Sequence, residues 1–556
     1  MIYTAFALTG LVLTLLILGV TFWKYRTKAP SYNKTVTGIA NFIDKYYFVF
    51  LMLIFAVFLL SRLLKLESFP NGLHVDELAV AVDAKSILLN GTDRWGYRFP
   101  AYFYDYGNGQ NALYVYIEAF MLMFLPSTIF VLRLQAVIWG ALAFFAMYGI
   151  CYEITEKKGY SLIGPVLVTT LPMYIMSERW ALEAYLFLPV AVITMYFLIR
   201  AVKYQKWPDW MLAGIFMGTS LYTYAVSYMA WPIFLILAFI YLIILKKIKV
   251  KNCVAFVIPL GILGFPLVLY QLVNFRIIEP LHFLMTDYIP LPYSRGEEMS
   301  ISNVIRNLKY FKELFLGGDE LTYNAFPEFG TIYMFLIPLV IAGFVICIKE
   351  TAESIRKREF TPLALILFFW FGGTVFMLVV KGPNVNRVNE LFLPFALFIF
   401  IAVYRLFAKN FLSLAWLSVW TGASFFLFMY FYFFVQNSVY GYHLIHTNAS
   451  PGKAIVRCEE NYLKDENTRI YIQYENEAIS PYEQVFYFAA KPGDVFDENG
   501  YEYGNVTAKL PEELDVNENA VYIIGDQWPH IVSYLIGEGF AADQTLPGYS
   551  ILFKVN

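Results

Sequence analysis

The chain is short of charge: only 15% of its 556 residues are Asp, Glu, Lys or Arg. An ordinary soluble domain is about a quarter charged, whereas this chain is 59% hydrophobic and 19% aromatic. The deficit argues against an ordinary soluble protein and indicates an integral membrane protein. The net charge is −2, and we expect no nucleic-acid partner.

Cysteines and nucleotide-binding motifs are also scarce. The four cysteines are scattered and form no CxxC pair, which argues against a structural zinc site and against redox chemistry. Walker A and Rossmann fingerprints are missing from the sequence, so ATP-driven transport and nucleotide-sugar binding gain no positive support.

Long apolar runs are what the chain has in abundance. A membrane span needs roughly 20 apolar residues, and about twelve runs qualify, some of them short. They cover about 2–23, 46–65, 129–151, 161–177, 184–202, 210–224, 226–245, 253–275, 329–348, 361–380, 388–406 and 411–435. Basic residues follow the first run instead of preceding it, which favours a retained span with an outer N-terminus over a signal peptide.

The basic loops set the predicted orientation. Cytoplasmic loops carry an excess of Lys and Arg, and every basic cluster falls inside if the shorter apolar run 112–125 does not cross the membrane. We therefore predict that 112–125 lies at the outer interface. The regions 66–128 and 276–328 and the tail from 436 then face outside, in a multi-pass protein of the plasma membrane.

These features predict a mainly α-helical transmembrane bundle with a small C-terminal α/β domain. Residues 1–45 would form an extra N-terminal span with a cytoplasmic loop, 46–435 the main membrane domain, and 436–556 the extracytoplasmic domain. The last region has 18 acidic against 7 basic residues. Its segments 469–474 and 520–525 are typical of strands, and two further stretches are typical of helices.

The first outer loop opens with "SFPNGLHVDELAVAVDA", in which Asp76 and Glu77 stand side by side after a turn. Apolar residues then recur at roughly helical spacing. One interpretation makes Asp76 a helix cap with Glu77 in the first turn, where the helix dipole favours carboxylates. The other makes one carboxylate a general base at the membrane surface. His74 is interpreted as a wall residue near the site.

The same loop continues with a stretch rich in aromatic and polar residues. Trp and Tyr commonly anchor proteins at the interface, but Arg94, Asp105 and their polar neighbours exceed what anchoring requires. Surfaces that bind sugars combine apolar faces with such hydrogen-bonding groups. We therefore predict that Arg94 and Asp105 bind substrate.

A second outer point is "MSERWALEAYL", with Glu178, Arg179 and Glu183 at a membrane boundary. For Glu178 we favour a snorkelling side chain at a helix end. Arg179 and Glu183 have the spacing of a helical ion pair, or could line a site shared with Asp76.

A third outer point is "VVKGPNVNRVNELFLP", which carries Lys381 and Arg387. Positive charge is not needed on this side for topology. Two cations with neighbouring asparagines suit a lipid-linked phosphate, although generic contact with lipid headgroups is an alternative.

Four landmarks in order resemble the GT-C superfamily of polytopic glycosyltransferases, most closely its protein O-mannosyltransferase and aminoarabinose transferase branch. They are the acidic pair Asp76-Glu77, "LPSTIFVLRLQAVIWG", "SERWALEAYL" and "NRVNELFLPFALFIF". The likeness covers roughly 46–406. Gln135 stands where proline is common in that branch, and Glu183 stands where Asp is more usual.

The resemblance implies transfer of a sugar from a polyprenyl-phosphate-linked donor to an acceptor hydroxyl, with inversion. Asp76 would be the catalytic base, supported by Glu77 and Glu183, and Lys381, Arg387 and Arg179 would bind the leaving phosphate. Relatives differ in their use of a divalent cation (Mg²⁺ or Mn²⁺), so the resemblance leaves the metal open. The acceptor could be a protein, a lipid or a cell-wall polymer, and membrane lipids are expected partners.

Two other classes of function stay open at this point. A transporter or flippase for a lipid-linked glycan would also need about twelve spans, but it predicts ionisable residues near the midplane. A scaffold that recruits a partner through its acidic tail is the third reading.

Overall fold

The computed structural model describes residues 2–27, 34–105, 108–292, 298–316, 321, 323–408, 410–436, 446–463, 465, 467–475, 481–497, 499–516 and 519–555. Part of the predicted loop 24–45 therefore lies outside the described residues. The described chain divides into two compact units. Unit 1 comprises 1–64, 136–271 and 292–439, and unit 2 comprises 65–135, 272–291 and 440–556.

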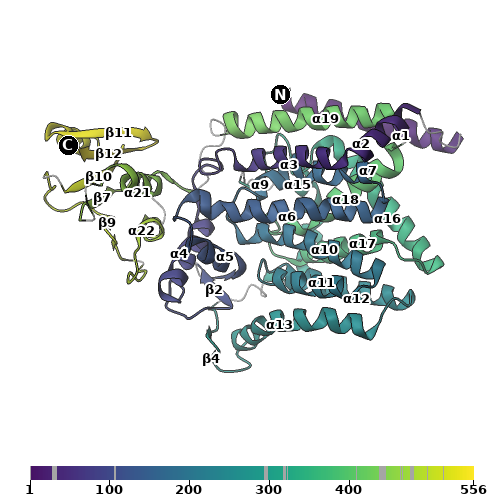
Figure 1. The fold of residues 1–556 in the computed structure, drawn as a ribbon, viewed down its shortest axis with the longest axis horizontal. Coiled ribbons are helices and arrows are strands. Elements are labelled where there is room, and N and C mark those ends of the chain that lie inside the picture. Colours follow the sequence, from purple (N-terminus) through teal and green to yellow (C-terminus); the bar gives the residue numbers. More distant parts are fainter. Residues whose placement is uncertain are drawn as a thin grey trace. The chain divides into compact units, whose positions relative to one another are not determined.

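Unit 1 is a bundle of helices that run side by side (Figure 1). Its helices are α1 (Ile2–Thr27), α2 (Lys34–Lys45), α3 (Tyr47–Leu63), α6 (Ile129–Thr155, whose first residues belong to unit 2), α7 (Lys158–Ser161), α8 (Ile163–Thr170), α9 (Pro172–Ser177), η1 (Glu183–Leu186), α10 (Phe187–Tyr204), α11 (Trp207–Ser220), α12 (Ser227–Ile244), α13 (Val250–Asn274), η3 (Ile301–Asn303), α14 (Val304–Asn307), α15 (Tyr310–Leu316), η4 (Met334–Leu336), α16 (Ile337–Lys357), α17 (Pro362–Val379), η5 (Asn389–Leu391), α18 (Phe392–Ala402), η6 (Val403–Phe407), α19 (Phe411–Tyr430) and η7 (Phe431–Val435).

Nine helices of the described chain are long and apolar enough to cross a membrane. They are α1, α6, η1–α10, α12, α13, η4–α16, α17, η5–α18–η6 and α19–η7. Three of the twelve predicted runs do not form one helix of span length. Helix α3 has 17 residues, α11 has 14, and 161–177 is divided among three helices. The protein is thus a multi-pass membrane protein with a mainly helical bundle.

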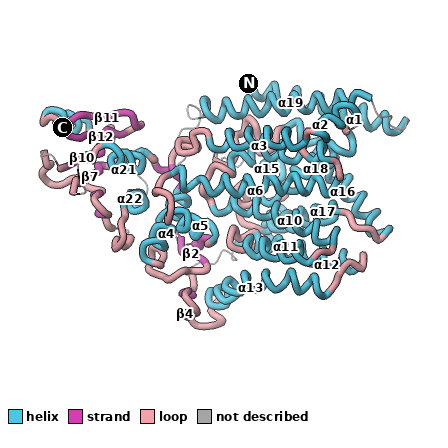
Figure 2. Tube along the Cα trace, in the orientation of Figure 1, coloured by secondary structure: helices cyan, strands magenta, loops and turns pink. Residues whose placement is uncertain are grey.

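Unit 2 combines helices with small sheets, which Figure 2 separates by colour. Its elements are β1 (Leu73–His74), α4 (Val75–Asn90), β2 (Tyr102–Asp105), β3 (Asn108–Asn111), α5 (Leu113–Leu122), β4 (Leu281–Phe283), β5 (Thr286–Tyr288), β6 (His446–Thr447), α21 (Ser450–Asn461), β7 (Arg469–Gln473), α22 (Pro481–Ala489), β8 (Glu502–Tyr503), β9 (Val506–Thr507), β10 (Ala520–Gly525), α23 (Pro529–Gly537), β11 (Phe540–Leu546) and β12 (Tyr549–Lys554).

The C-terminal part of unit 2 is built on a six-stranded sheet in the order β11-β12-β10-β7-β9-β8. The central pairs β10–β7 and β7–β9 are parallel, and the other pairs are antiparallel. Tyr522, Leu535 and Phe540 form part of its core. The predicted strands 469–474 and 520–525 are confirmed as β7 and β10, and the predicted helices as α22 and α23.

The predicted first outer loop and the C-terminal tail fall within the same unit. β1 pairs with β6, and α4 contacts α22. Helix α5, the predicted interfacial run 112–125, has ten residues and is too short for a span of about 20. The start of α4, where Asp76 stands, is therefore built from segments that are remote in sequence.

Candidate functional site

Helix α4 begins with a reciprocal cap. The Nδ1 atom of His74 accepts the backbone N–H of Asp76 at 3.0 Å, and Glu77 Oε2 accepts the backbone N–H of His74 at 3.1 Å. This capping box satisfies N–H groups that have no partner within the helix. The interpretation of Asp76 as the cap is wrong, because the cap is His74.

Glu77 is held by a fully buried arginine at the start of α6. Arg133 Nε and Nη2 donate to the two carboxylate oxygens of Glu77, each at 2.9 Å. The remaining Arg133 donors bind the carbonyls of Leu66, Pro70 and Gly72 at 2.7–3.1 Å. A rigid guanidinium fork suits this pattern, which lysine could not reproduce. Arg133 therefore fixes both the acidic pair and the turn that leads into it.

Asp76 differs from its neighbour because its carboxylate is open. Its side chain is 41% exposed, whereas that of Glu77 is fully buried. The carboxylate stands in the first turn of α4, where the partial positive charge of the helix favours an anion. The cap thus fixes the backbone of Asp76 and leaves its side chain accessible.

Farther along the same loop, Arg94 joins three acidic residues. It donates to both oxygens of Asp83, at 3.1 and 2.9 Å, and to Glu483 Oε1 of α22 at 2.9 Å. Asp105 Oδ1 lies 3.7 Å from Arg94 Nη2, beyond hydrogen-bond distance. Arg94 therefore connects the loop to the C-terminal sheet domain within unit 2.

Burial raises the pKa of Asp105 to about 8, against the lowering effect of Arg94. Asp76, Asp83 and Glu483 add to the rise, because each places negative charge near this carboxyl group. Asp105 Oδ1 is buried and has no hydrogen-bond partner. Burial and the surrounding negative charge therefore favour the protonated form of the Asp105 carboxyl group.

In unit 1, the Arg179 side chain caps the C-terminal end of helix α3. Its Nη1 donates to the carbonyls of Ser61 and Arg62, and its Nη2 to that of Leu64 at 2.8 Å. These carbonyls lie at the C-terminal end of α3, where a cation is favoured. Arg179 is fully buried and stacks near the rings of Tyr432 and Phe433.

Glu178 forms a buried ion pair, which corrects the expectation of snorkelling. Arg62 Nε lies 2.8 Å from Glu178 Oε2, and the two side chains are 0% and 5% exposed. Arg62 also donates to the carbonyls of Val168 and Thr169. A charge this deep is stable only when paired, and its partner lies on the distant helix α3.

The remaining predicted residues of unit 1 lie at the ends of spans. Glu183 is buried at the start of η1. Arg387 Nη1 lies 2.8 Å from Glu298 Oε2 and 2.8 Å from the carbonyl oxygen of Lys381. The Lys381 side chain is exposed and that of Arg387 is one-third exposed. The turn thus carries an exposed Lys381 side chain and a partly exposed Arg387 that Glu298 holds in place.

Comparison with known proteins connects this architecture to sugar transfer. Residues 112–272 match the family model of dolichyl-phosphate-mannose-protein mannosyltransferase. The structure is similar to that of ArnT from Cupriavidus metallidurans bound to undecaprenyl phosphate, with a TM-score of 0.50 and 11% identity, over 91% of this chain and 98% of that one. The chain therefore shares the fold of ArnT, and its segment 112–272 resembles this mannosyltransferase family.

Two other similar structures are of the oligosaccharyltransferase AglB from Archaeoglobus fulgidus. One is in complex with an inhibitory peptide and a dolichol-phosphate (TM-score 0.45, 12% identity, 92% of this chain and 75% of that chain). The other is a complex with Zn and sulfate (TM-score 0.44, 12% identity, 86% and 68%). No curated protein matches the sequence significantly.

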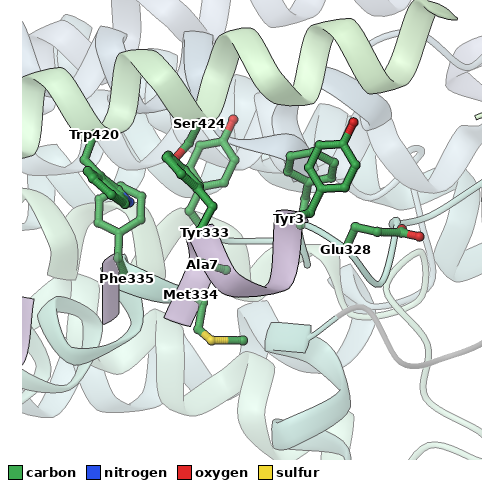
Figure 3. Close-up of a pocket in the computed structure, with 10 residues that line it drawn as sticks. Tyr3, Ala7, Glu328, Tyr333, Met334, Phe335, Trp420 and Ser424 are labelled. Atoms are coloured by element: carbon green, nitrogen blue, oxygen red, sulfur yellow. The ribbon is translucent and has the colours of Figure 1, made fainter. Parts of the chain in front are cut away.

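A small cavity lies between α1, η4 and α19 (Figure 3). Tyr3, Tyr333 and Trp420 line it, and Phe6 stacks on Trp420 with a centroid distance of 4.4 Å. Its volume of about 20 Å³ holds little more than one water molecule. The cavity is therefore too small for a sugar and belongs to the packing of α1.

The side chains around Asp76 decide whether this region could hold a metal ion. In the described part of the chain, no group of three or more His, Cys, Asp or Glu side chains is arranged to hold a metal ion. Near Asp76, Arg133 occupies both carboxylate oxygens of Glu77. The Asp83 carboxylate is likewise neutralised by Arg94, so neither carboxylate is available to a metal ion. These residues do not fit a metal site.

Sequence reasoning missed four residues that bind the candidate residues in the two units. They are Arg62, Asp83, Arg133 and Glu483. Arg62 and Arg133 each stood inside an apolar run, where an ionisable residue indicates a buried partner or a site. Asp83 and Glu483 carried no comparable signal, because both stand in ordinary amphipathic surroundings.

Proposed function

We propose that this protein is a GT-C-type glycosyltransferase that moves a sugar from a polyprenyl-phosphate-linked donor to an acceptor hydroxyl, with Asp76 as general base. The observation that carries the proposal is the contrast at the start of α4: a fixed backbone, a locked Glu77 and an open Asp76 carboxylate. The similar ArnT structure contains undecaprenyl phosphate, which supports a polyprenyl-phosphate lipid as the donor class.

In the proposed reaction Asp76 takes the proton of the acceptor hydroxyl. The hydroxyl oxygen then bonds to the anomeric carbon, the bond from that carbon to the phosphate oxygen breaks, and the phosphate leaves with the electron pair. One displacement inverts the anomeric configuration. A hydroxyl is a poor nucleophile at neutral pH, and a positioned base contributes about 10²–10⁴-fold.

Other residues have proposed binding roles. Lys381 and Arg387 would bind the phosphate, since charge-assisted hydrogen bonds to phosphate are strong and Arg387 is held in place by Glu298. Asp105 would accept hydrogen bonds from a sugar, and Arg94 and His74 would position the loop around Asp76. Glu77, Glu183 and Arg179 would act as supports, since all three are buried.

The cellular setting is part of the proposal. The basic loops support a plasma-membrane protein whose Asp76 faces the outer side, where the acceptor is a protein, a lipid or a cell-wall polymer.

The test is Asp76→Asn in the purified protein in lipid nanodiscs, with a polyprenyl-phosphate-sugar donor. We expect transfer to fall at least about 100-fold while undecaprenyl phosphate still binds, because the substitution removes the base and keeps the shape. Glu67→Gln is the matched control, since Glu67 is an exposed carboxylate in the same loop. Unchanged transfer by Asp76→Asn contradicts the role of Asp76. Movement of the intact donor lipid without a new glycosidic bond would favour a flippase.

A further inference from the structure

The short helical segment 301–312 of unit 1, here called the isoleucine segment, has its amphipathic faces reversed. Ile301, Ile305 and Leu308 are 85%, 82% and 53% exposed. Their spacing of four and three residues places them on one face of η3 and α14. In water, a helical face of this kind would normally be the buried one.

The buried face of the isoleucine segment begins with polar residues. Asn303 and Asn307 are buried, and the stripe continues through Tyr310 and Leu314 at helical spacing. The apolar and polar faces of η3 and α14 have therefore exchanged their usual places. Such an inversion is stable where the surroundings of the exposed face are apolar.

The asparagines attach the segment to the end of a membrane span. Asn307 Nδ2 lies 3.0, 3.0 and 2.6 Å from the carbonyl oxygens of Met377, Leu378 and Val380. Asn303 Nδ2 donates to the carbonyl of Val379 at 2.8 Å. These are the last carbonyls of α17, which lack partners within the helix. The segment is thus fixed at the level where α17 leaves the hydrocarbon.

The charges of the segment fit the same level. Arg306 and Lys309 are exposed and lie on the helix surface between the apolar and the polar stripes. Basic side chains at a membrane surface extend toward the headgroups while apolar neighbours enter the acyl region. Glu298, just before the segment, holds Arg387, so the segment also borders the turn with Lys381.

We propose that the isoleucine segment inserts Ile301, Ile305 and Leu308 into the lipid bilayer as an interfacial anchor beside the end of α17. The partner is the lipid of the leaflet at that end. The anchor keeps the turn that carries Lys381 and Arg387 at the depth of lipid phosphates. The insertion itself does not depend on the proposed reaction, because it follows from the inverted faces and the attachment to α17.

The test measures the depth of a spin label in nanodiscs of phosphatidylcholine and phosphatidylglycerol. The label is placed at Ile305→Cys in the full-length protein with Cys253→Ser, because Cys253 is the half-buried cysteine and the other three give little or no access. Oxygen collects in the acyl region and a nickel chelate stays in water. We expect oxygen to increase the relaxation rate of the label at 305 several-fold more than the nickel chelate does.

The matched control is Val495→Cys, at an apolar side chain of the C-terminal part that is 66% exposed. We expect it to favour nickel, as we expect for Ser302→Cys on the side of the same segment. A label at 305 that behaves like the one at 495 overturns the proposal. A label at 305 shielded from both reagents also overturns it, since that result would place a protein surface, such as a second copy, over the segment.

Discussion

Each unit holds a buried pair of an arginine with a glutamate that can be compared, Arg133 with Glu77 in unit 2 and Arg62 with Glu178 in unit 1. Arg133 and Glu77 in unit 2 bind each other through two parallel contacts of 2.9 Å. Arg62 and Glu178 in unit 1 meet through one contact of 2.8 Å. Both arginines also bind carbonyl oxygens. Both pairs thus consist of the same residue types and both bind backbone carbonyls. They differ in the residues that lie next to the glutamate.

Beside Glu77 stands the open carboxylate of Asp76, whereas the surroundings of Glu178 are closed. A Cβ atom at Gly140 of α6 would lie only 2.7 Å from Glu178 Cδ, so α6 needs a glycine to pass this carboxylate. The comparison teaches that a buried ion pair does not by itself mark a site. In the proposed function, the site is marked instead by the accessible Asp76 carboxylate, whose position the Arg133–Glu77 pair fixes.

The largest expected effect comes from removing one partner of each pair. Glu77→Gln and Glu178→Gln should each lower the free energy of unfolding by about 3–5 kcal/mol, because each leaves a buried arginine without its counter-charge. Denaturation of the purified protein measures this loss. Transfer per folded molecule should fall only for Glu77→Gln, because only that pair positions Asp76.

Glu67→Gln serves as the control for both variants, since an exposed carboxylate should change stability by less than about 0.5 kcal/mol. Equal transfer activities per folded molecule for Glu77→Gln and Glu178→Gln would contradict the claim that only the Arg133–Glu77 pair positions Asp76.

A smaller effect is expected at Glu118, a buried carboxyl that has neutral partners instead of an arginine. Tyr487 donates to it at 3.0 Å and Gln135 at 3.3 Å. Burial raises the pKa of Glu118 to about 7, and these two bonds oppose the rise. The folded state therefore holds the proton more tightly than the unfolded state, and stability falls as pH rises from about 4.5 to about 7.

Between pH 5.5 and 8, deprotonation of Glu118 should lower the free energy of unfolding by about 2 kcal/mol. Thermal melting at the two pH values, for the natural chain and for Glu118→Gln, measures it. The substitution should reduce the pH dependence, because the amide does not titrate. A variant that is as pH-sensitive as the natural chain would assign the dependence to other carboxyl groups, such as Asp105.

The smallest effect is expected at the partly exposed ion pair between Arg387 and Glu298 in unit 1. Arg387 and Glu298 lie 2.8 Å apart, but their side chains are 33% and 17% exposed. Glu298→Gln should lower the free energy of unfolding by less than about 1 kcal/mol, since water replaces the lost interaction. Denaturation at low and high salt checks this, and a loss above 3 kcal/mol would place this pair with the buried ones.

The sequence allowed the fold class to be predicted because apolar runs of span length are a local property. All twelve predicted runs fall on helices, and nine helices of the described chain reach span length. The difference at 161–177 has a local cause, since Pro172 begins α9 after an extended Leu171. Run length alone does not reveal such a break.

The candidate site was less predictable, because its contacts join distant segments. The pair Asp76-Glu77 was visible as two carboxylates, but only the fold separates a locked Glu77 from an open Asp76. Likewise, Arg179 stood out in the sequence as a boundary cation, while its acceptors are the carbonyls at the end of α3. Which donor meets which acceptor depends on tertiary packing.

The pairing of β1 with β6 bears on how the protein is made. His74 lies opposite His446 in this two-stranded sheet, so the strand just before α4 is completed by a strand that is synthesised about 370 residues later. At about 5–20 residues per second, a ribosome needs roughly 20–75 s to cover that distance. The segment that carries Asp76 therefore reaches its final form only after the last span has been made, and a chain that stops early leaves the membrane bundle without it.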